Sequence, residues 1–166
     1  MYKTGDQLVY AGHGVCTVCD LEERVVDKKT VQYYVLQPVD QSASRFYVPA
    51  HNPAALKKLR PILTKDEWLQ LLSSDDVRKD CWIADEGSRK TAYRELISSC
   101  DRESLLSMIN TLHRHRSECI AQGRKFHLCD ENFLRDAQRI LSAELSVVLQ
   151  IPPAEVPEYV QHIFER

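Results

Sequence analysis

Hydrophobic residues follow different patterns in the two halves of the chain. Over residues 1–50, β-branched and aromatic side chains alternate with polar ones, which is typical of strands in a half-buried sheet. The pattern predicts four strands, at residues 7–10, 15–26, 30–39 and 45–48, with a turn at residues 27–29. The alternation is interrupted by adjacent apolar residues, as expected where the strands of a small barrel curl. The first half therefore predicts a small β domain.

The second half has the features of a helical region. Residues 62–151 contain no proline and only two glycines, which favours several helices. Thr64 and Glu67 form a capping box, which predicts a helix that ends at residue 72. Further helices are expected to begin at Gly87-Ser88, Asp101 and Asp130, and a short amphipathic helix follows Pro152-Pro153. A polar run at residues 73–76 divides the chain, so we expect an α+β protein with a β domain at 1–72 and a helical domain at 73–166.

Composition excludes several classes of protein. The 166 residues include 22 Lys and Arg against 24 Asp and Glu, so no chain-wide cationic field can wrap nucleic acid as a histone does. Mean hydropathy is −0.38, and no run approaches the roughly 20 apolar residues that span a bilayer. The first residues lack the charged and apolar regions of an export signal, and the six cysteines lack the density of a secreted scaffold. We expect a reduced, cytoplasmic protein without a membrane partner.

Motifs for catalysis and metal binding are weak. The sequence has no nucleophile elbow, phosphate-binding loop, zinc-protease motif or dinucleotide fingerprint, so we expect no enzyme and no cofactor. Cys16 and Cys19 form a lone CxxC pair with His13 three residues ahead, whereas structural zinc normally takes two spaced pairs of ligands. Residues i and i+3 of a strand face opposite sides, which favours ordinary buried cysteines over a zinc site.

A local excess of basic residues makes nucleic acid a candidate partner. The segment at residues 87–127 carries eight Lys and Arg against four Asp and Glu. The candidates for phosphate contacts are Arg89, Lys90, Arg94, Arg114, Arg124 and Lys125. Solvated helix faces would produce the same pattern. Trp82 also has two interpretations, because it can be a core residue or an exposed apolar wedge that acts on an unstacked base step.

The chain resembles the CarD/CdnL/TRCF family of bacterial transcription factors. The residues that carry the resemblance are Gly5-Asp6-x-Leu8-Val9-Tyr10-x-x-His13-Gly14, Tyr33-Tyr34-Val35-Leu36, Val48-Pro49, Ser88-Arg89-Lys90 and Ile140-Leu141-x-x-Glu144-Leu145. The similarity extends over residues 2–149, and the N-terminal signature is its most specific part. The resemblance implies a Tudor-like antiparallel β barrel that docks on the β subunit of bacterial RNA polymerase.

The same resemblance implies roles for individual residues. Arg24 occupies a polymerase-contacting position, and Tyr47 occupies the second such position, which is basic in the family. The helical domain is expected to contact promoter DNA at the upstream edge of the bubble, with Trp82 as the wedge, one turn before the family's position. Such a protein stabilises the open complex, catalyses nothing and is expected to be a monomer. The alternative is an interaction module that docks on polymerase or another partner without touching DNA.

Overall fold

The computed structural model describes residues 1–39 and 43–165, which form two compact units. The first comprises Met1–Ile62 and the second Leu63–Arg166, and each has its own hydrophobic core. The division falls before the helix at residues 65–72 rather than after it, because Trp68 and Leu72 on that helix are completely buried in the core of the second unit.

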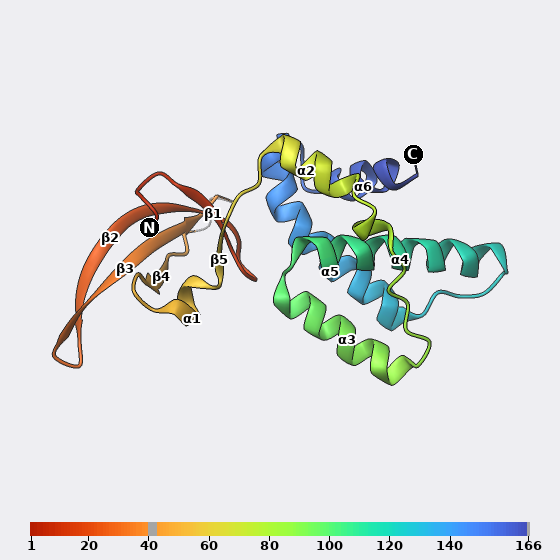
Figure 1. Cartoon of the computed structure of the whole chain (residues 1–166), viewed down its shortest axis with the longest axis horizontal. Coiled ribbons are helices and arrows are strands. Elements are labelled where there is room, and N and C mark those ends of the chain that lie inside the picture. The colour runs from red at the N-terminus through yellow and green to blue at the C-terminus, as the bar shows by residue number, and fades with distance from the viewer. Residues whose placement is uncertain (40–42, 166) are drawn as a thin grey trace. The chain divides into compact units, whose positions relative to one another are not determined.

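The first unit is an antiparallel sheet. Its elements are β1 (Gln7–Tyr10), β2 (Gly14–Val26), β3 (Lys29–Pro38), β4 (Phe46–Pro49), the short helix α1 (Pro53–Leu56) and β5 (Leu59–Pro61). The strand order is β4-β3-β2-β1-β5 (Figure 1). In the described residues β4 pairs only with β3 and β5 only with β1, so the sheet keeps two edges and is not the closed barrel that we expected. The α+β class is confirmed.

The expected hairpin between β2 and β3 is present. Asp27 and Lys28 both have positive φ, at 49° and 62°, as a two-residue type I′ turn requires. The strand β5 was not predicted: it is only three residues long, and it ends in a proline, which is confined to edge strands.

A bulge in β2 decides which side chains face outward. The register between β2 and β3 shifts between Val18 and Asp20. Before the bulge, Cys16 and Val18 lie in the core with Tyr34 and Leu36 of β3. After it, the residues paired with Val31, Tyr33 and Val35 share the opposite face, which also carries Tyr47 of β4. The bulge therefore places Arg24 and Tyr47 on the same side of the sheet.

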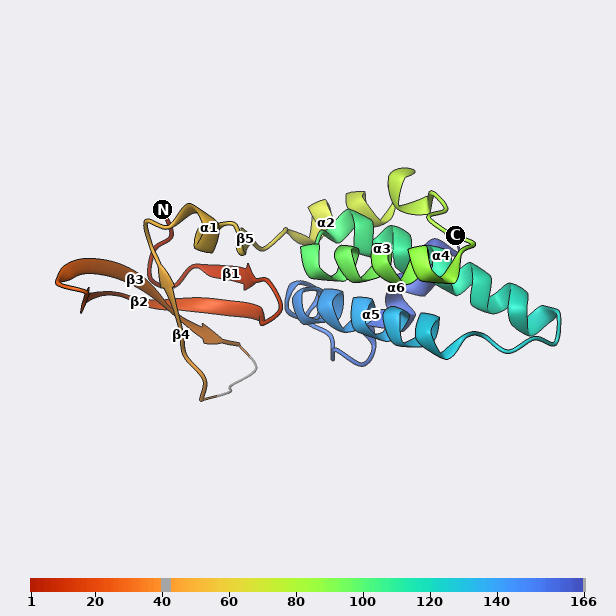
Figure 2. The same ribbon diagram turned by 90° about the horizontal axis from the view of Figure 1, so that it is seen from below.

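The second unit is helical. Its elements are α2 (Lys65–Leu72), the 3₁₀ helix η1 (Asp76–Arg78), α3 (Glu86–Ser99), α4 (Arg102–Ala121), α5 (Leu128–Leu149) and α6 (Val156–Phe164). Figure 2 shows α3, α4 and α5 side by side. The capping box of α2 and the Asp101 cap of α4 are confirmed. Two expected helix starts are wrong, because Asp85 caps α3 and His127 caps α5. Every helix in the described part of the chain is too short or too polar to cross a bilayer.

The core of this unit is organised around a buried carboxylate as well as apolar side chains. Glu144 of α5 is 2% exposed. Its carboxylate accepts hydrogen bonds from the Leu63 backbone N–H at 3.1 Å and from Trp68 Nε1 at 3.3 Å. Arg102 of α4 donates two more, at 2.8 and 2.9 Å. Four donors therefore compensate the desolvation of Glu144 and tie the start of the unit to α4 and α5.

Candidate functional site

An exposed pair of side chains marks the outer face of the sheet. The guanidinium carbon of Arg24, on β2, lies 3.7 Å from the ring centroid of Tyr47, on β4. The two strands are separated by β3, on which Arg24 is opposite Val31 and Tyr47 is opposite Val35, so the pair reaches diagonally across this strand. Both predicted partner-binding residues are therefore in contact, in an exposed cation–π arrangement.

Glu22 orients the arginine of this pair. Its carboxylate accepts from Nε and Nη2 of Arg24 at 3.3 and 3.0 Å. This hydrogen bond raises the pKa of Arg24, so the guanidinium stays charged. The Arg24 side chain remains 45% exposed. It can therefore offer donors to a partner while Tyr47 holds it against the sheet.

The sheet also exposes valines that the sequence analysis did not select. Val25 and Val26, next to the β2–β3 turn, are 76% and 44% exposed. Val26 shares the face of Arg24, two residues away along β2. Adjacent residues of a strand point to opposite faces of the sheet, so the side chains at a hairpin tip cannot cover both valines. The two adjacent valines in the sequence were therefore a signal that one apolar side chain would be exposed. Together, Arg24, Val26 and Tyr47 form a mixed apolar and cationic surface, which we call the sheet face.

On the helical unit, Arg89 does not have the exposed position that we predicted. It is 5% exposed, and its Nε and Nη2 donate to the two carboxylate oxygens of Asp130 at 2.9 and 3.0 Å. Nη1 donates to the backbone oxygens of Ile83 and Ala84. The Asp130 hydrogen bonds raise the pKa of Arg89. This guanidinium is occupied within the fold and does not face a ligand.

Trp82 lies at the edge of the helical core. It is half-buried, and the guanidinium carbon of Arg89 lies 4.2 Å from its ring. The imidazole of His115 stacks on the indole with 3.7 Å between centroids and 17° between planes. Asp80 accepts the Trp82 backbone N–H at 3.0 Å. The indole is therefore neither fully buried in the core nor fully exposed, and it is held in place by contacts with His115 and Arg89. His115 was not among the predicted site residues.

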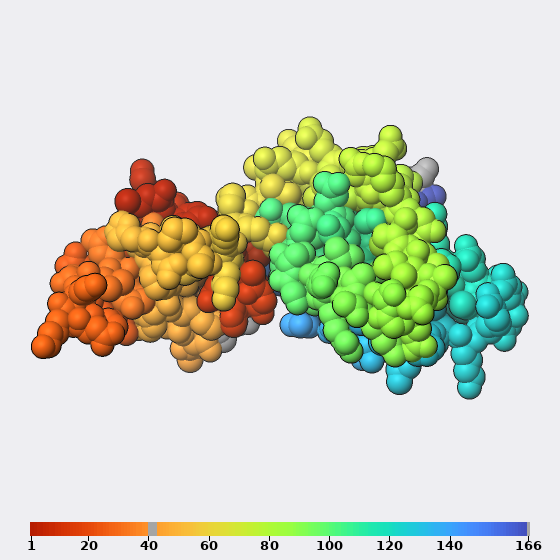
Figure 3. Space-filling view, turned by 60° about the horizontal axis from the view of Figure 1, so that its bottom comes forward, coloured from red at the N-terminus to blue at the C-terminus, as the bar shows by residue number. Residues whose placement is uncertain are grey.

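The other basic candidates divide into paired and unpaired side chains. Lys90 bonds to Glu86, which raises the pKa of Lys90, and Arg114 lies 3.2 Å from Asp80. Arg94, Arg124 and Lys125 are exposed and form no ion pair within residues 1–39 and 43–165. Figure 3 shows the last turns of α4 and the following loop, which carries Arg124 and Lys125, standing out from the helical unit. These three cations are the most accessible of the predicted set.

His113 adds no charge to this region. Burial lowers the pKa of His113, which also contacts Gln138 through Nε2 at 3.1 Å, so His113 is neutral at pH 7. Arg116 lies 3.7 Å from Glu131. His113 therefore does not add to the charge that the lysines and arginines of the region supply.

The CxxC cysteines do not form part of a metal centre in the described residues. Cys16 is completely buried in the sheet core. Cys19 lies in the bulge of β2, with its Sγ 3.5 Å from Gln37 Oε1. No group of three or more His, Cys, Asp or Glu side chains in the described part of the chain is arranged to hold a metal ion.

The structure is that of a two-unit α+β protein with an exposed apolar and cationic face on its sheet and a helical unit that carries exposed cations. Residues 2–63 match the family model of the CarD-like/TRCF RID domain. The N-terminal unit is therefore a CarD-like/TRCF RID domain, a type associated with RNA polymerase interaction, and the resemblance is confirmed over these residues. The match ends where the helical unit begins. No curated protein matches the chain.

Proposed function

We propose that this chain is a non-enzymatic, cytoplasmic regulator of transcription that binds the β subunit of bacterial RNA polymerase through its N-terminal unit. The observation that carries the proposal is the RID domain at residues 2–63 with its exposed Arg24–Tyr47 pair. Arginine and tyrosine are enriched among the residues that dominate protein interfaces. In this proposal the sheet is an open variant of a Tudor-like domain, and the sheet face is the polymerase contact.

We further propose that the helical unit contacts promoter DNA at the upstream edge of the bubble and stabilises the open complex. Three unpaired cations support only non-specific binding, with a dissociation constant on the order of 10⁻⁴–10⁻⁶ M. Attachment to polymerase raises the local concentration of the helical unit to roughly millimolar. This concentration exceeds the weak dissociation constant, so a tethered unit occupies the DNA where a free one does not. If the helical unit binds open promoter DNA more tightly than closed DNA, it shifts the equilibrium toward the open complex.

The polymerase contact is tested by reversing the charge of Arg24 in the full chain. Arg24→Glu removes the cation–π contact and places a carboxylate beside Glu22, so binding to purified polymerase is expected to weaken about 10-fold or more. The measurement is a surface-binding titration with purified polymerase. Lys57→Glu, which makes the same charge change at an exposed residue after α1, is the matched control. Equal affinities for the two variants would contradict a role for the sheet face.

A second candidate function is a polymerase-docking module that does not touch DNA. The burial of Arg89 and the pairing of Lys90 and Arg114 favour it, because they reduce the charge available for phosphates. Salt dependence separates the two functions. If Arg94, Arg124 and Lys125 contact phosphates, DNA affinity should fall about 40-fold between 50 and 200 mM salt. The measurement is a fluorescence titration of fork-junction DNA with the polymerase complex, corrected for the same titration without this protein. If the contribution of this protein to DNA affinity is the same at 50 and 200 mM salt, the result supports a docking module that does not touch DNA.

A further inference from the structure

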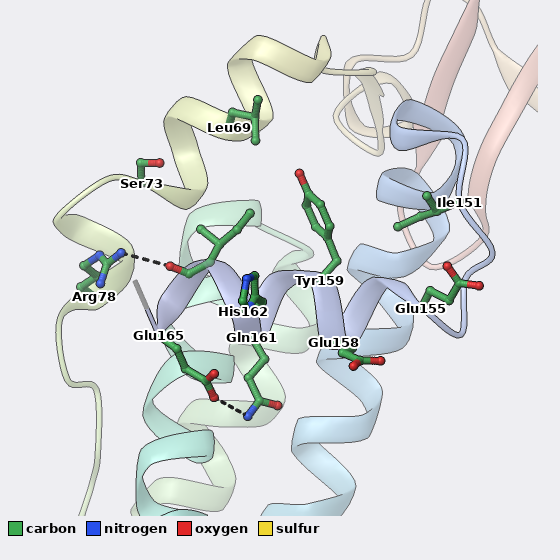
Figure 4. Close-up of a pocket in the computed structure, with 11 residues that line it drawn as sticks. Leu69, Ser73, Arg78, Ile151, Glu155, Glu158, Tyr159, Gln161, His162 and Glu165 are labelled. Carbon is green, nitrogen blue, oxygen red and sulfur yellow. Dashed lines mark hydrogen bonds between the residues drawn. The ribbon is translucent and has the colours of Figure 1, made fainter.

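A groove in the helical unit has no role in either proposed function. It lies between α2, η1 and α6 and has a volume of about 920 Å³ (Figure 4). The residues that form α6 lie beyond the segment that matches the RID domain. Val156 and Val160 hold α6 against the core, with exposures of 1% and 4%. The other side of α6 is left to line the groove.

The inner surface of the groove is apolar. Leu69 of α2, Ile151 before α6 and Tyr159 of α6 line it and are only partly buried. Figure 4 shows the Tyr159 ring rising from α6 toward α2. The Tyr159 hydroxyl has no hydrogen-bond partner among the described residues. Such a surface offers apolar contact area and one free polar group to an occupant.

The charge around the groove is negative. Glu155, Glu158 and Glu165 line it. Arg78 is the one Lys or Arg among its lining residues, and its guanidinium donates to the backbone oxygens of Phe164 and Ile163 at 3.3 and 3.4 Å. These carbonyls engage the arginine, and Glu165 Oε1 accepts a hydrogen bond from the neutral amide Nε2 of Gln161 at 2.8 Å. With three Glu and one Arg, the Lys, Arg, Asp and Glu residues among the described lining therefore carry a net negative charge. An occupant with apolar and cationic groups would be complementary to this surface.

The spacing of the carboxylates indicates an occupant with two separated cationic groups rather than one small cation. Glu158 and Glu165 are seven residues apart on or next to α6, which corresponds to about 10 Å along a helix. A cation with one charged group cannot pair with both, whereas a helix with basic residues two turns apart can. We infer that the groove binds a cationic amphipathic peptide segment of a partner protein, which places its apolar side on Leu69, Ile151 and Tyr159. This inference does not depend on the proposed polymerase or DNA contacts.

The test is a selection from a random dodecapeptide display library on the immobilised full chain. The inference predicts enrichment of peptides that combine Leu, Ile or aromatic residues with Lys or Arg. Glu158→Lys should weaken binding of an enriched, fluorescein-labelled peptide about 10-fold in an anisotropy titration. Tyr159→Ala should weaken it similarly, since α6 is held by Val156 and Val160. Glu95→Lys, at an exposed residue of α3, is the matched charge control and should leave affinity unchanged.

Each other outcome overturns the inference. No enrichment, or enrichment of acidic peptides, contradicts the charge complementarity. Peptides that bind Glu158→Lys and Tyr159→Ala as tightly as the unmodified chain occupy another surface. Urea unfolding of both variants identifies any loss of binding that comes from an unfolded helical unit. In that case the peptide titration is repeated with Glu158→Gln, a change at an exposed position. Unchanged peptide affinity in Glu158→Gln then contradicts the inference.

Discussion

Replacing Asp130 with alanine is expected to destabilise the helical unit by about 3–5 kcal/mol. Arg89 is 5% exposed and Asp130 2% exposed, and two hydrogen bonds join their charged groups. The substitution leaves the guanidinium buried with only the carbonyl oxygens of Ile83 and Ala84 as partners. Loss of one partner of a buried pair costs more than the pair contributes, because the remaining charge is desolvated. Urea unfolding followed by circular dichroism measures the effect.

Glu131 offers a matched control for this prediction. It is the next residue in the first turn of α5, so Glu131→Ala removes the same charge from the same helix end. Its partner Arg116 is exposed and lies 3.7 Å away, and a pair of this kind contributes about 0–1 kcal/mol. A loss below about 1 kcal/mol for Asp130→Ala would mean that the Arg89 charge is compensated by another group or by water.

The second large effect is expected at Trp82. Trp82→Ala should shorten the lifetime of the open complex by about 5- to 30-fold, which corresponds to about 1–2 kcal/mol. Stacking of an aromatic side chain on a base contributes about 1–3 kcal/mol. The indole already stacks on His115, so the net gain at the bubble is smaller than that of an unsupported ring. Competitor-challenge decay of promoter complexes measures the lifetime.

Two further variants separate the indole from its surroundings. Trp82→Phe keeps an aromatic ring and should retain more of the lifetime than Trp82→Ala. His115→Ala removes the supporting ring and should have a smaller effect than loss of the indole, because Arg89 still contacts Trp82. Affinity for polymerase should be unchanged in all three. An unaltered lifetime in Trp82→Ala would remove this residue from the DNA contact.

Local patterns in the sequence were sufficient for much of the fold. The alternation in the first half located four strands to within a few residues, and the turn at Asp27 followed from the short polar break between two apolar runs. The Thr64 capping box and the Asp101 cap are likewise local, because each involves side chain and backbone within three residues. Such features depend on neighbours in the chain and can be predicted from it.

Contacts between distant segments could not be predicted in this way. Asp130 has the residue type of a helix cap, yet His127 caps α5 and Asp130 lies in the first turn, where it binds Arg89, 41 residues away. The same contact removes Arg89 from the cationic surface. The cation–π pair of Arg24 and Tyr47 depends on the β2 bulge and on the strand that lies between them. The sequence identifies the basic residues, but it does not show which of them pair with acidic residues in the folded protein.

Binding of polymerase by the N-terminal unit can be measured by separating the two units. Residues 1–62 and residues 63–166 have independent cores, so each can be expressed alone beside the full chain. The measurement is binding of each to the purified β subunit of RNA polymerase by isothermal titration calorimetry. We expect residues 1–62 to bind with the affinity of the full chain and residues 63–166 not to bind. Binding by residues 63–166 alone, or none by residues 1–62, would contradict polymerase binding by the N-terminal unit.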